Sequence, residues 1–345
     1  MGGVHAHAVR VSGAELRYVA SSSRDSAQRA ATEFGATYTA NSAEELIEAD
    51  DVDVVHICVP NALHGTLGRA SLAANKHVIC EKPLATDVET AVDLLARSRD
   101  AGSVTAVPFI YRYYPSVREA HAQIASGQAG ALHLIHGSYL QDWMTGSQSA
   151  NWRLDPERGG VSKTFADIGV HWCDLMEFTT GHRITRVCAR TMSVSPGSAT
   201  EDGATVMFET DKGATGSLVV SQVSVGRKNR LWFSVDGAQG AYVFDQEVPE
   251  VLWVGDRREN RIVPRGESGQ SEEATRLSAL PAGHPQGYQD CFNAFVADTY
   301  ATVHGQHRDG LPTFADGSRA ASITDAVRRS AATESWVKVA REGIA

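Results

Sequence analysis

The sequence lacks the features that mark several large classes of protein. No apolar run approaches the length of a membrane-spanning helix, so we expect no membrane partner. The 32 lysines and arginines are outnumbered by 41 aspartates and glutamates, and a net charge of −9 without a basic cluster argues against binding nucleic acid or anionic lipid. The five cysteines contain no CxxC pair, which favours unpaired, buried thiols in a reducing cytoplasm.

Length and composition indicate a globular chain of two domains. The chain has 345 residues, of which 42% are hydrophobic and 21% are charged. Each half of such a chain is long enough to bury a core of its own. We find no internal repeat and no low-complexity segment.

The most informative stretch is residues 77–84, which read HVICEKPL. Residues 77–80 favour a buried strand, and Glu81, Lys82 and Pro83 follow it directly. In an open parallel sheet, ligands bind beyond the carboxyl ends of the strands, so Glu81 and Lys82 are expected to face a ligand. Pro83 would stop the strand and stiffen the turn. The alternative is a solvated turn that ends an ordinary strand.

A second unit of the same kind precedes this stretch. Residues 52–59 (VDVVHICV) are almost continuously apolar and rich in β-branched side chains, as in a strand covered on both faces. The strand ends in Pro60 and Asn61, His64 follows, and residues 67–74 predict a helix. This alternation of strand, polar turn and helix predicts a parallel sheet.

A further cluster of chemical groups lies in residues 165–177, FADIGVHWCDLME. Asp167, His171 and Asp174 have the spacing i, i+4 and i+7, which predicts one face of a helix. We expect Asp167 to orient the imidazole of His171 and raise its basicity, as a proton-abstracting base requires. Asp174 is expected to be a structural hydrogen-bond partner. The alternative is that Asp167 is an N-cap residue and His171 lies on the surface. We expect no metal, because the sequence shows no third ligand motif to accompany this aspartate and histidine.

Together these segments resemble the glucose-fructose oxidoreductase / inositol dehydrogenase (Gfo/Idh/MocA) family. Its members carry a strand ending in PNxxH, then a strand ending in EKP, and later the pattern DxGxHxxD. The segments GHPQGY and PTFADG near the C-terminus are similar to those of bacterial sugar dehydrogenases of the family, including levoglucosan-type and inositol-type enzymes. The matching positions here are Pro60, Asn61, His64, Glu81, Lys82, Pro83, Asp167, Gly169, His171 and Asp174.

The resemblance implies an α/β architecture. Residues 1–116 would form a Rossmann-like parallel-sheet domain, and residues 117–345 an α+β domain for substrate binding and oligomerisation, with a large, mainly antiparallel, open-faced sheet. Residues 184–254 alternate in short runs that predict an antiparallel meander, whereas residues 257–281 are polar and predict a loop. An open sheet face leads us to expect a homo-oligomer, a dimer or tetramer.

The beginning of the chain matches the family pattern in part. Members start with a strand that leads into GxGxxGxxH, and only Gly2 with His5 fits the end of that pattern. We expect a start assigned too late by roughly a dozen residues, because losing a central strand costs more than the few kcal/mol by which a domain is stable.

The cofactor that the resemblance implies is NAD(P). After the strand predicted at residues 16–20, Ser22, Ser23 and Arg24 stand where an NAD site has an acid for the ribose hydroxyls, whereas an arginine can pair with a 2′-phosphate. We therefore favour NADP; the alternative is an arginine in a first helical turn capped by the serines. The cofactor-binding candidates are Gly2, Gly3, Ser22, Ser23, Arg24, Val59, Pro60, Asn61, His64, Glu81 and Lys82.

The implied activity is hydride transfer between the nicotinamide and a hydroxyl carbon of a sugar or cyclitol. Of the catalytic candidates Lys82, Asp167 and His171, the imidazole would take the hydroxyl proton and the lysine would stabilise negative charge on the substrate oxygen. Two alternatives remain within this fold, a non-catalytic dinucleotide- or sugar-binding regulator and an NAD-dependent glycosidase. The substrate-binding candidates are Arg112, Trp152, Arg153, His171 and His284.

Overall fold

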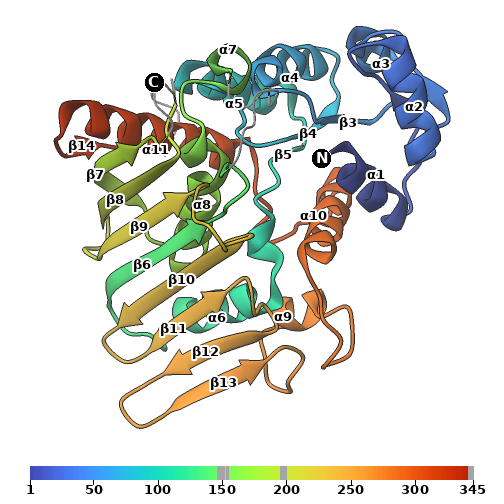
Figure 1. The fold of residues 1–345 in the computed structure, drawn as a ribbon. Helices are drawn as coiled ribbons and strands as arrows, with labels where there is room; N and C mark the ends of the chain where they lie inside the picture. The colour runs from blue at the N-terminus through green and yellow to red at the C-terminus, as the bar shows by residue number, and fades with distance from the viewer. Residues whose placement is uncertain (146–151, 153–154, 195–199, 341–345) are drawn as a thin grey trace.

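The computed structural model describes residues 1–145, 152, 155–194 and 200–340 (Figure 1). Within this part of the chain, two small parallel sheets of two and three strands precede one nine-stranded sheet. The predicted combination of a Rossmann-like parallel sheet with a large, mainly antiparallel sheet is therefore confirmed. None of the described helices combines the length and apolarity needed to cross a membrane.

The N-terminal part alternates helices with short strands. β1 pairs with β2, and β4 lies between β3 and β5, all in parallel. The elements are α1 (Gly2–Val11), β1 (Tyr18–Val19), α2 (Arg24–Phe34), β2 (Tyr38–Thr39), α3 (Ala43–Glu48), β3 (Val54–Ile57), the 3-10 turn η1 (Asn61–Leu63), α4 (His64–Ala73), β4 (His77–Cys80), α5 (Val88–Ala101), β5 (Thr105–Ala106) and the 3-10 turn η2 (Ile110–Tyr113).

The turn after β4 is held between two well-defined elements. β4 is the central strand of the three-stranded sheet. Its bounds are those predicted from the sequence HVIC. α5 begins where the Asp87 side chain accepts a hydrogen bond from the backbone N–H of Thr90, and it ends at Gly102 in the left-handed conformation, with φ of 63°. The EKP turn therefore connects a buried strand to a capped helix.

The C-terminal part is built on the nine-stranded sheet, with the order β13-β12-β11-β10-β6-β9-β8-β7-β14. Its elements are α6 (Pro115–Ala125), β6 (Leu132–Leu140), α7 (Pro156–Gly159), the π-helical turn η4 (Phe165–Gly169), α8 (Val170–Thr180), β7 (Ile184–Met192), β8 (Gly203–Thr210), β9 (Thr215–Ser221), β10 (Arg230–Gly237), β11 (Ala241–Asp245), β12 (Val251–Gly255), β13 (Asn260–Pro264), α9 (Glu272–Leu277), α10 (Tyr288–Val303), α11 (Phe314–Thr333) and β14 (Val337–Lys338).

Two predictions about this part were wrong. The strands after residue 184 do not form a simple meander, because β6 lies between β10 and β9 and runs parallel to β9. Alternating hydrophobicity predicts strands but carries no information about such a non-local neighbour. Residues 257–281 are not all loop, since β13 pairs with β12 as an edge strand and the Ser271 side chain caps α9. Both elements are polar because one side of each is exposed.

One face of the large sheet is covered by helices, among them α8, which crosses β6 and β10 (Figure 1). The indole N–H of Trp172 in α8 donates to the carbonyl of Trp232 at 2.9 Å. A Cβ at Gly137 in β6 would lie 2.4 Å from the same indole nitrogen and 2.2 Å from that carbonyl oxygen. Only a glycine therefore allows α8 to approach the sheet this closely.

The last two long helices contact the N-terminal part. α10 packs against α1, and α11 packs against both α5 and β7. These contacts hold the carboxyl end of β4 next to η4 and α8, where the predicted catalytic residues lie.

Candidate functional site

Two side chains that the sequence singled out form an ion pair between the two parts of the chain. Lys82 Nζ lies 2.5 Å from Asp167 Oδ1 and 2.9 Å from the backbone carbonyl oxygen of Asp167. The side chains are 16% and 20% exposed, respectively. The pair is therefore ordered by two hydrogen bonds but still accessible to a small ligand.

Asp167 lies in the π-helical turn η4, and α8 starts immediately after it. A π-helical turn holds an extra residue, so the predicted regular i, i+4, i+7 face does not form, and such turns are common at functional sites. The carboxylate of Asp167 bonds Lys82 and Gln222, and not the imidazole of His171. The prediction that Asp167 orients His171 was therefore wrong.

Aromatic rings surround His171, whose side chain is buried in α8. The ring centroids of Phe109, Tyr111 and Tyr139 lie 5.7, 5.3 and 6.4 Å from the centroid of its imidazole. The Nδ1 atom of His171 is fully buried and has no hydrogen-bond partner among the described residues. Nε2 is therefore the nitrogen through which His171 can reach a ligand.

Electrostatics keep the His171 imidazole neutral. Burial and then the positive charge of Lys82 lower the pKa of His171 to about 3, while Asp167 and Glu81 oppose the shift. An uncharged imidazole can accept a proton at neutral pH, whereas an imidazolium cannot.

Neutral polar side chains continue from Asp167 along one end of the large sheet. Gln222 Nε2 donates to Asp167 Oδ2 at 2.7 Å and lies 3.4 Å from Gln141 Oε1. Asn229 Oδ1 accepts hydrogen bonds from Gln141 Nε2 at 2.7 Å and from the Tyr139 hydroxyl at 2.8 Å. This row of hydrogen-bonded side chains offers amide and hydroxyl groups to a ligand, and Asp167 is its one charged member.

Sequence reasoning missed the three amide side chains of this network. Gln141 follows β6, Gln222 follows the parallel strand β9, and Asn229 precedes the antiparallel strand β10. All three therefore lie at the same end of the sheet. Their signal in the sequence is a polar residue next to a predicted strand, which is too common to single them out.

Glu81 turns away from Lys82 into a buried chain of histidines. Glu81 Oε1 lies 3.0 Å from His5 Nε2, His5 Nδ1 lies 2.8 Å from His56 Nδ1, and His56 Nε2 lies 2.9 Å from the Tyr300 hydroxyl. Burial opposes a charge on His5, but Cys58 and Glu81 raise its pKa to about 10. Burial and the charge of His5 lower the pKa of His56. A charged His5 thus donates to both neighbours and connects α1, β3, α10 and the EKP turn.

His64 and Asn61 support the turns around Lys82. The His64 ring nitrogens lie 2.7 Å from the carbonyl oxygen of Pro83 and 3.0 Å from that of Val59, so the imidazole bridges the two turns that follow β3 and β4. The Asn61 side-chain amide donates to the carbonyl of Gly159 at 2.9 Å. Both residues hold backbone in position next to the predicted cofactor site.

The other cofactor candidates lie at the starts of α1 and α2. Gly2 and Gly3 open α1, which has no side-chain cap on its first N–H groups. The Ser23 side chain is the N-cap of α2, while Ser22 and Arg24 are exposed next to it.

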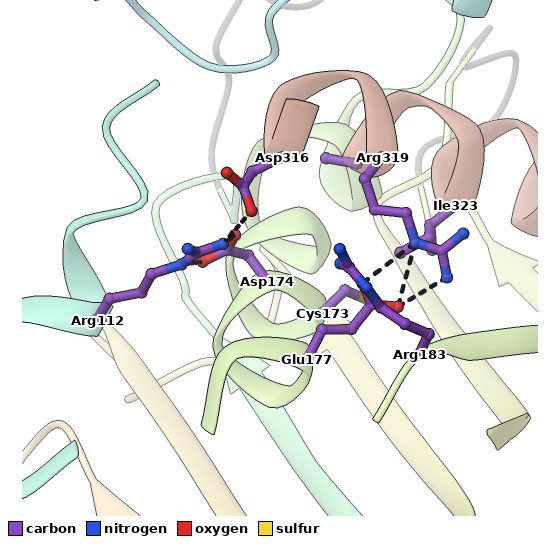
Figure 2. Close-up of a pocket in the computed structure, with 9 residues that line it drawn as sticks. Arg112, Cys173, Asp174, Glu177, Arg183, Asp316, Arg319 and Ile323 are labelled. Carbon is purple, nitrogen blue, oxygen red and sulfur yellow. Dashed lines mark hydrogen bonds and ion pairs between the residues drawn. The ribbon is translucent and has the colours of Figure 1, made fainter. Parts of the chain in front are cut away.

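Arg112 does not face the site, contrary to the sequence prediction. Its guanidinium is 7% exposed and donates through Nε to Asp174 Oδ2 at 2.8 Å and through Nη2 to Asp316 Oδ1 at 2.6 Å (Figure 2). The predicted structural role of Asp174 is confirmed by this pair. Beside it, Glu177 pairs with Arg319 at 2.7 Å.

The space among these charged residues is a cavity of roughly 10 Å³, enough for at most a single water molecule. It therefore cannot admit a sugar. Arg112 belongs to an ion-pair network that joins η2, α8 and α11.

Two of the remaining substrate candidates, His284 and Trp152, belong to the described residues. His284 is exposed, and its carbonyl accepts a hydrogen bond at 2.5 Å from Arg265, which follows the edge strand β13. Trp152 is partly buried, and Arg153 lies outside the described residues.

Residues 1–109 match the family described as an oxidoreductase family with an NAD-binding Rossmann fold, and residues 117–243 match the GFO/IDH/MocA C-terminal domain. Levoglucosan dehydrogenase of Pseudarthrobacter phenanthrenivorans is 30% identical over 94% of this chain and 89% of its own length. The chain belongs to the Gfo/Idh/MocA family. The family predicted from the sequence is thus confirmed, and with it the assignment of the chain as an NAD-binding oxidoreductase.

The chain is also similar to a solved structure and to a second named enzyme. A solved structure of a levoglucosan dehydrogenase in complex with NADH has a TM-score of 0.92 at 29% identity, covering 99% of this chain and 96% of that one. The 1,5-anhydro-D-fructose reductase of Ensifer adhaerens is 34% identical over 57% of this chain and 58% of its own length.

Proposed function

We propose that this oxidoreductase transfers hydride between NAD(P) and a hydroxyl-bearing carbon of an uncharged sugar or cyclitol. The observation that carries the proposal is the Lys82–Asp167 ion pair next to the neutral imidazole of His171, at the carboxyl end of β4. The names of the relatives, a levoglucosan dehydrogenase and an anhydrofructose reductase, support a sugar substrate.

The residues present fit a bound dinucleotide. The first N–H groups of α1 carry no side-chain cap, and such a helix start favours a phosphate group. Lys82 and Asn61 lie beyond the carboxyl ends of parallel strands, where a nicotinamide ribose would be held. When bound, the nicotinamide accepts or supplies the hydride.

We further propose NADP as the preferred cofactor. No acidic side chain directly follows β1, where one would hold the ribose hydroxyls of NAD, whereas Arg24 opens α2 and is exposed. A guanidinium at this point can make charge-assisted hydrogen bonds to a 2′-phosphate.

The protein side chains then divide the work on the substrate hydroxyl. His171 accepts its proton through Nε2, because Nδ1 is buried. Lys82 donates to the substrate oxygen and stabilises the negative charge that develops there. Asp167 holds the lysine in place by two contacts, one from its carboxylate and one from its carbonyl.

We also propose that the open face of the large sheet joins two copies of the chain. Leu134, Met207 and Val219 are exposed and alternate along β6, β8 and β9 with residues that are buried under the helices. An apolar sheet face of this kind is favourable only when covered. Light scattering would measure the molar mass, and a monomer at micromolar concentration would contradict this proposal.

The test of the function is a turnover assay with NAD⁺ and NADP⁺ on levoglucosan, anhydrosugars, aldoses and inositols. We expect reduced nicotinamide to form with at least one polyol and Lys82→Met to lower kcat/KM by about a hundredfold or more. Lys76→Met is the matched control, because within the described part of the chain Lys76 bonds only the backbone carbonyls of Ala49 and Val52.

Near-normal turnover by the Lys82→Met variant would contradict the assignment. Binding of NADPH without turnover of any polyol would indicate the regulator. Release of free sugar from a glycoside without net reduction of the cofactor would indicate the glycosidase.

A further inference from the structure

Gln222 is a fully buried polar residue that contacts the proposed catalytic machinery. It follows β9 directly and none of its surface is exposed. Its backbone is fixed, because its N–H donates to the carbonyl of Asp202 at 3.0 Å and its carbonyl accepts from Met144 at 3.1 Å. The side-chain amide is therefore presented to Asp167 from a rigid strand end.

The amide bonds two positions of the segment that forms the π-helical turn. Its Nε2 donates to Asp167 Oδ2 at 2.7 Å, and its Oε1 lies 3.0 Å from the hydroxyl of Thr164, the residue that precedes η4. The reverse orientation of the amide would turn a carbonyl oxygen towards the carboxylate, so the donor must face Asp167. Gln222 thereby leaves Oδ1 of Asp167 for Lys82.

Other contacts anchor the same segment without touching the Asp167 carboxylate. Glu201 Oε1 accepts hydrogen bonds from the Ser162 hydroxyl at 2.7 Å and from the backbone N–H of Phe165 at 2.9 Å. Lys163 Nζ lies 2.5 Å from Asp202 Oδ1. Because these contacts remain when the amide is removed, a change at Gln222 acts mainly on Asp167 and less on the fold.

We propose that Gln222 is a positioning residue that keeps Asp167 ionised and aimed at Lys82. The inference rests on the proposed function for the role of that ion pair in turnover. A hydrogen-bond donor to a carboxylate favours its charged form, so removal of the donor shifts protonation of Asp167 to higher pH. Protonation would leave Lys82 held only by the backbone carbonyl of Asp167 and would weaken its hold on the substrate oxygen.

Among the described titratable groups around Asp167, Lys82 is the one that carries a positive charge. The neighbouring tyrosines have raised pKa values and stay neutral in the range of the assay, as does His171. The groups concerned are Lys82 after β4, His171 in α8, Tyr111 in η2, Tyr139 in β6 and Tyr288 in α10.

Two substitutions move the pH profile in opposite directions. Gln222→Leu removes the donor, so we expect the acid limb of kcat to move to higher pH and turnover at neutral pH to fall roughly tenfold or more. Gln222→Glu keeps the shape and the oxygen that faces Thr164 but sets two carboxyl groups against each other, which share one proton. We expect this variant to retain activity at low pH and to lose it as pH rises.

The matched control is Gln286→Leu, because Gln286 is another buried glutamine. Among the residues that the structure describes, its side chain bonds only backbone, the carbonyl of Leu277 at 3.1 Å and the N–H of Leu280 at 3.4 Å. It should lose stability without a change in the pH profile. An unchanged profile in both Gln222 variants, with only kcat or stability lowered, would assign Gln222 a purely structural role. If Gln222→Leu fails to fold, Gln222→Glu alone decides, since it preserves volume.

A second measurement needs no turnover. The ¹³Cγ chemical shift of Asp167, assigned by its loss in Asp167→Asn, reports protonation of the carboxyl directly in wild type and in Gln222→Leu. A titration shifted to higher pH in the variant supports the inference, and an unshifted one overturns it. If no polyol is turned over by the wild type, the proposed function fails and this titration still decides the role of Gln222.

Discussion

Replacing Arg112 with methionine should destabilise the protein strongly while leaving KM for the polyol almost unchanged. The guanidinium and its partners Asp174 and Asp316 are 7%, 5% and 19% exposed. Removal of the cation leaves two carboxylates in the interior without their main partner. Breaking a buried ion pair in this way costs about 3–5 kcal/mol, a large part of the total stability of about 5–15 kcal/mol.

The assay combines thermal unfolding with steady-state kinetics. A loss of this size lowers the Tm on the order of 10 °C. The double variant Arg112→Met/Asp174→Leu should recover much of the loss, because it removes one of the stranded charges and Asp316 keeps its hydrogen bond from the backbone of Thr313 at 2.7 Å. A Tm within a degree or so of wild type, together with KM raised tenfold, would refute the structural role and restore Arg112 as a substrate ligand.

Three further results are expected. His171→Asn should lower kcat by about 10²- to 10⁴-fold without weakening NADPH binding, measured by steady-state kinetics and nicotinamide fluorescence; equal losses in both would contradict a role in proton transfer. Arg24→Ala should weaken NADPH binding about tenfold but leave NADH unaffected in the same titration. Because the pKa of His5 rises from 6.5 to about 10 on folding, its contribution to stability is complete below about pH 6.5 and is lost towards pH 10. His5→Gln should therefore flatten the pH dependence of urea unfolding over this range.

Sequence reasoning singled out those residues of the candidate site that follow from local patterns. Lys82 follows a strand that could be identified from HVIC, and the carboxyl end of a buried parallel strand is where a ligand is expected. Glu81 in the same turn was also expected to face a ligand, but its carboxylate bonds the buried His5 instead. Asp167 and His171 were singled out from their spacing, although neither the π-helical turn nor the bonds of Asp167 to Lys82 and Gln222 were predicted. A π-helical turn depends on packing around it and has no pattern of its own in the sequence.

The remaining contacts could not be predicted because they join residues far apart in the chain. Arg112 is separated by 62 residues from Asp174 and by 204 from Asp316. Gln222 meets Asp167 because the end of β9 lies next to η4, which is 55 residues away in the sequence. Hydrophobic periodicity in the sequence predicts individual helices and strands. It does not predict which elements become neighbours in the folded chain.

The close contact between α8 and the sheet at Gly137 also bears on how the protein can evolve. Because the indole of Trp172 fills the space where a side chain would stand, neither the helix nor the strand can shift without losing that contact. The distance between His171 and the sheet is therefore expected to stay the same when residues at the strand ends are substituted. Under the proposed function, substitutions at the strand ends would change the substrate while the position of His171 stays fixed.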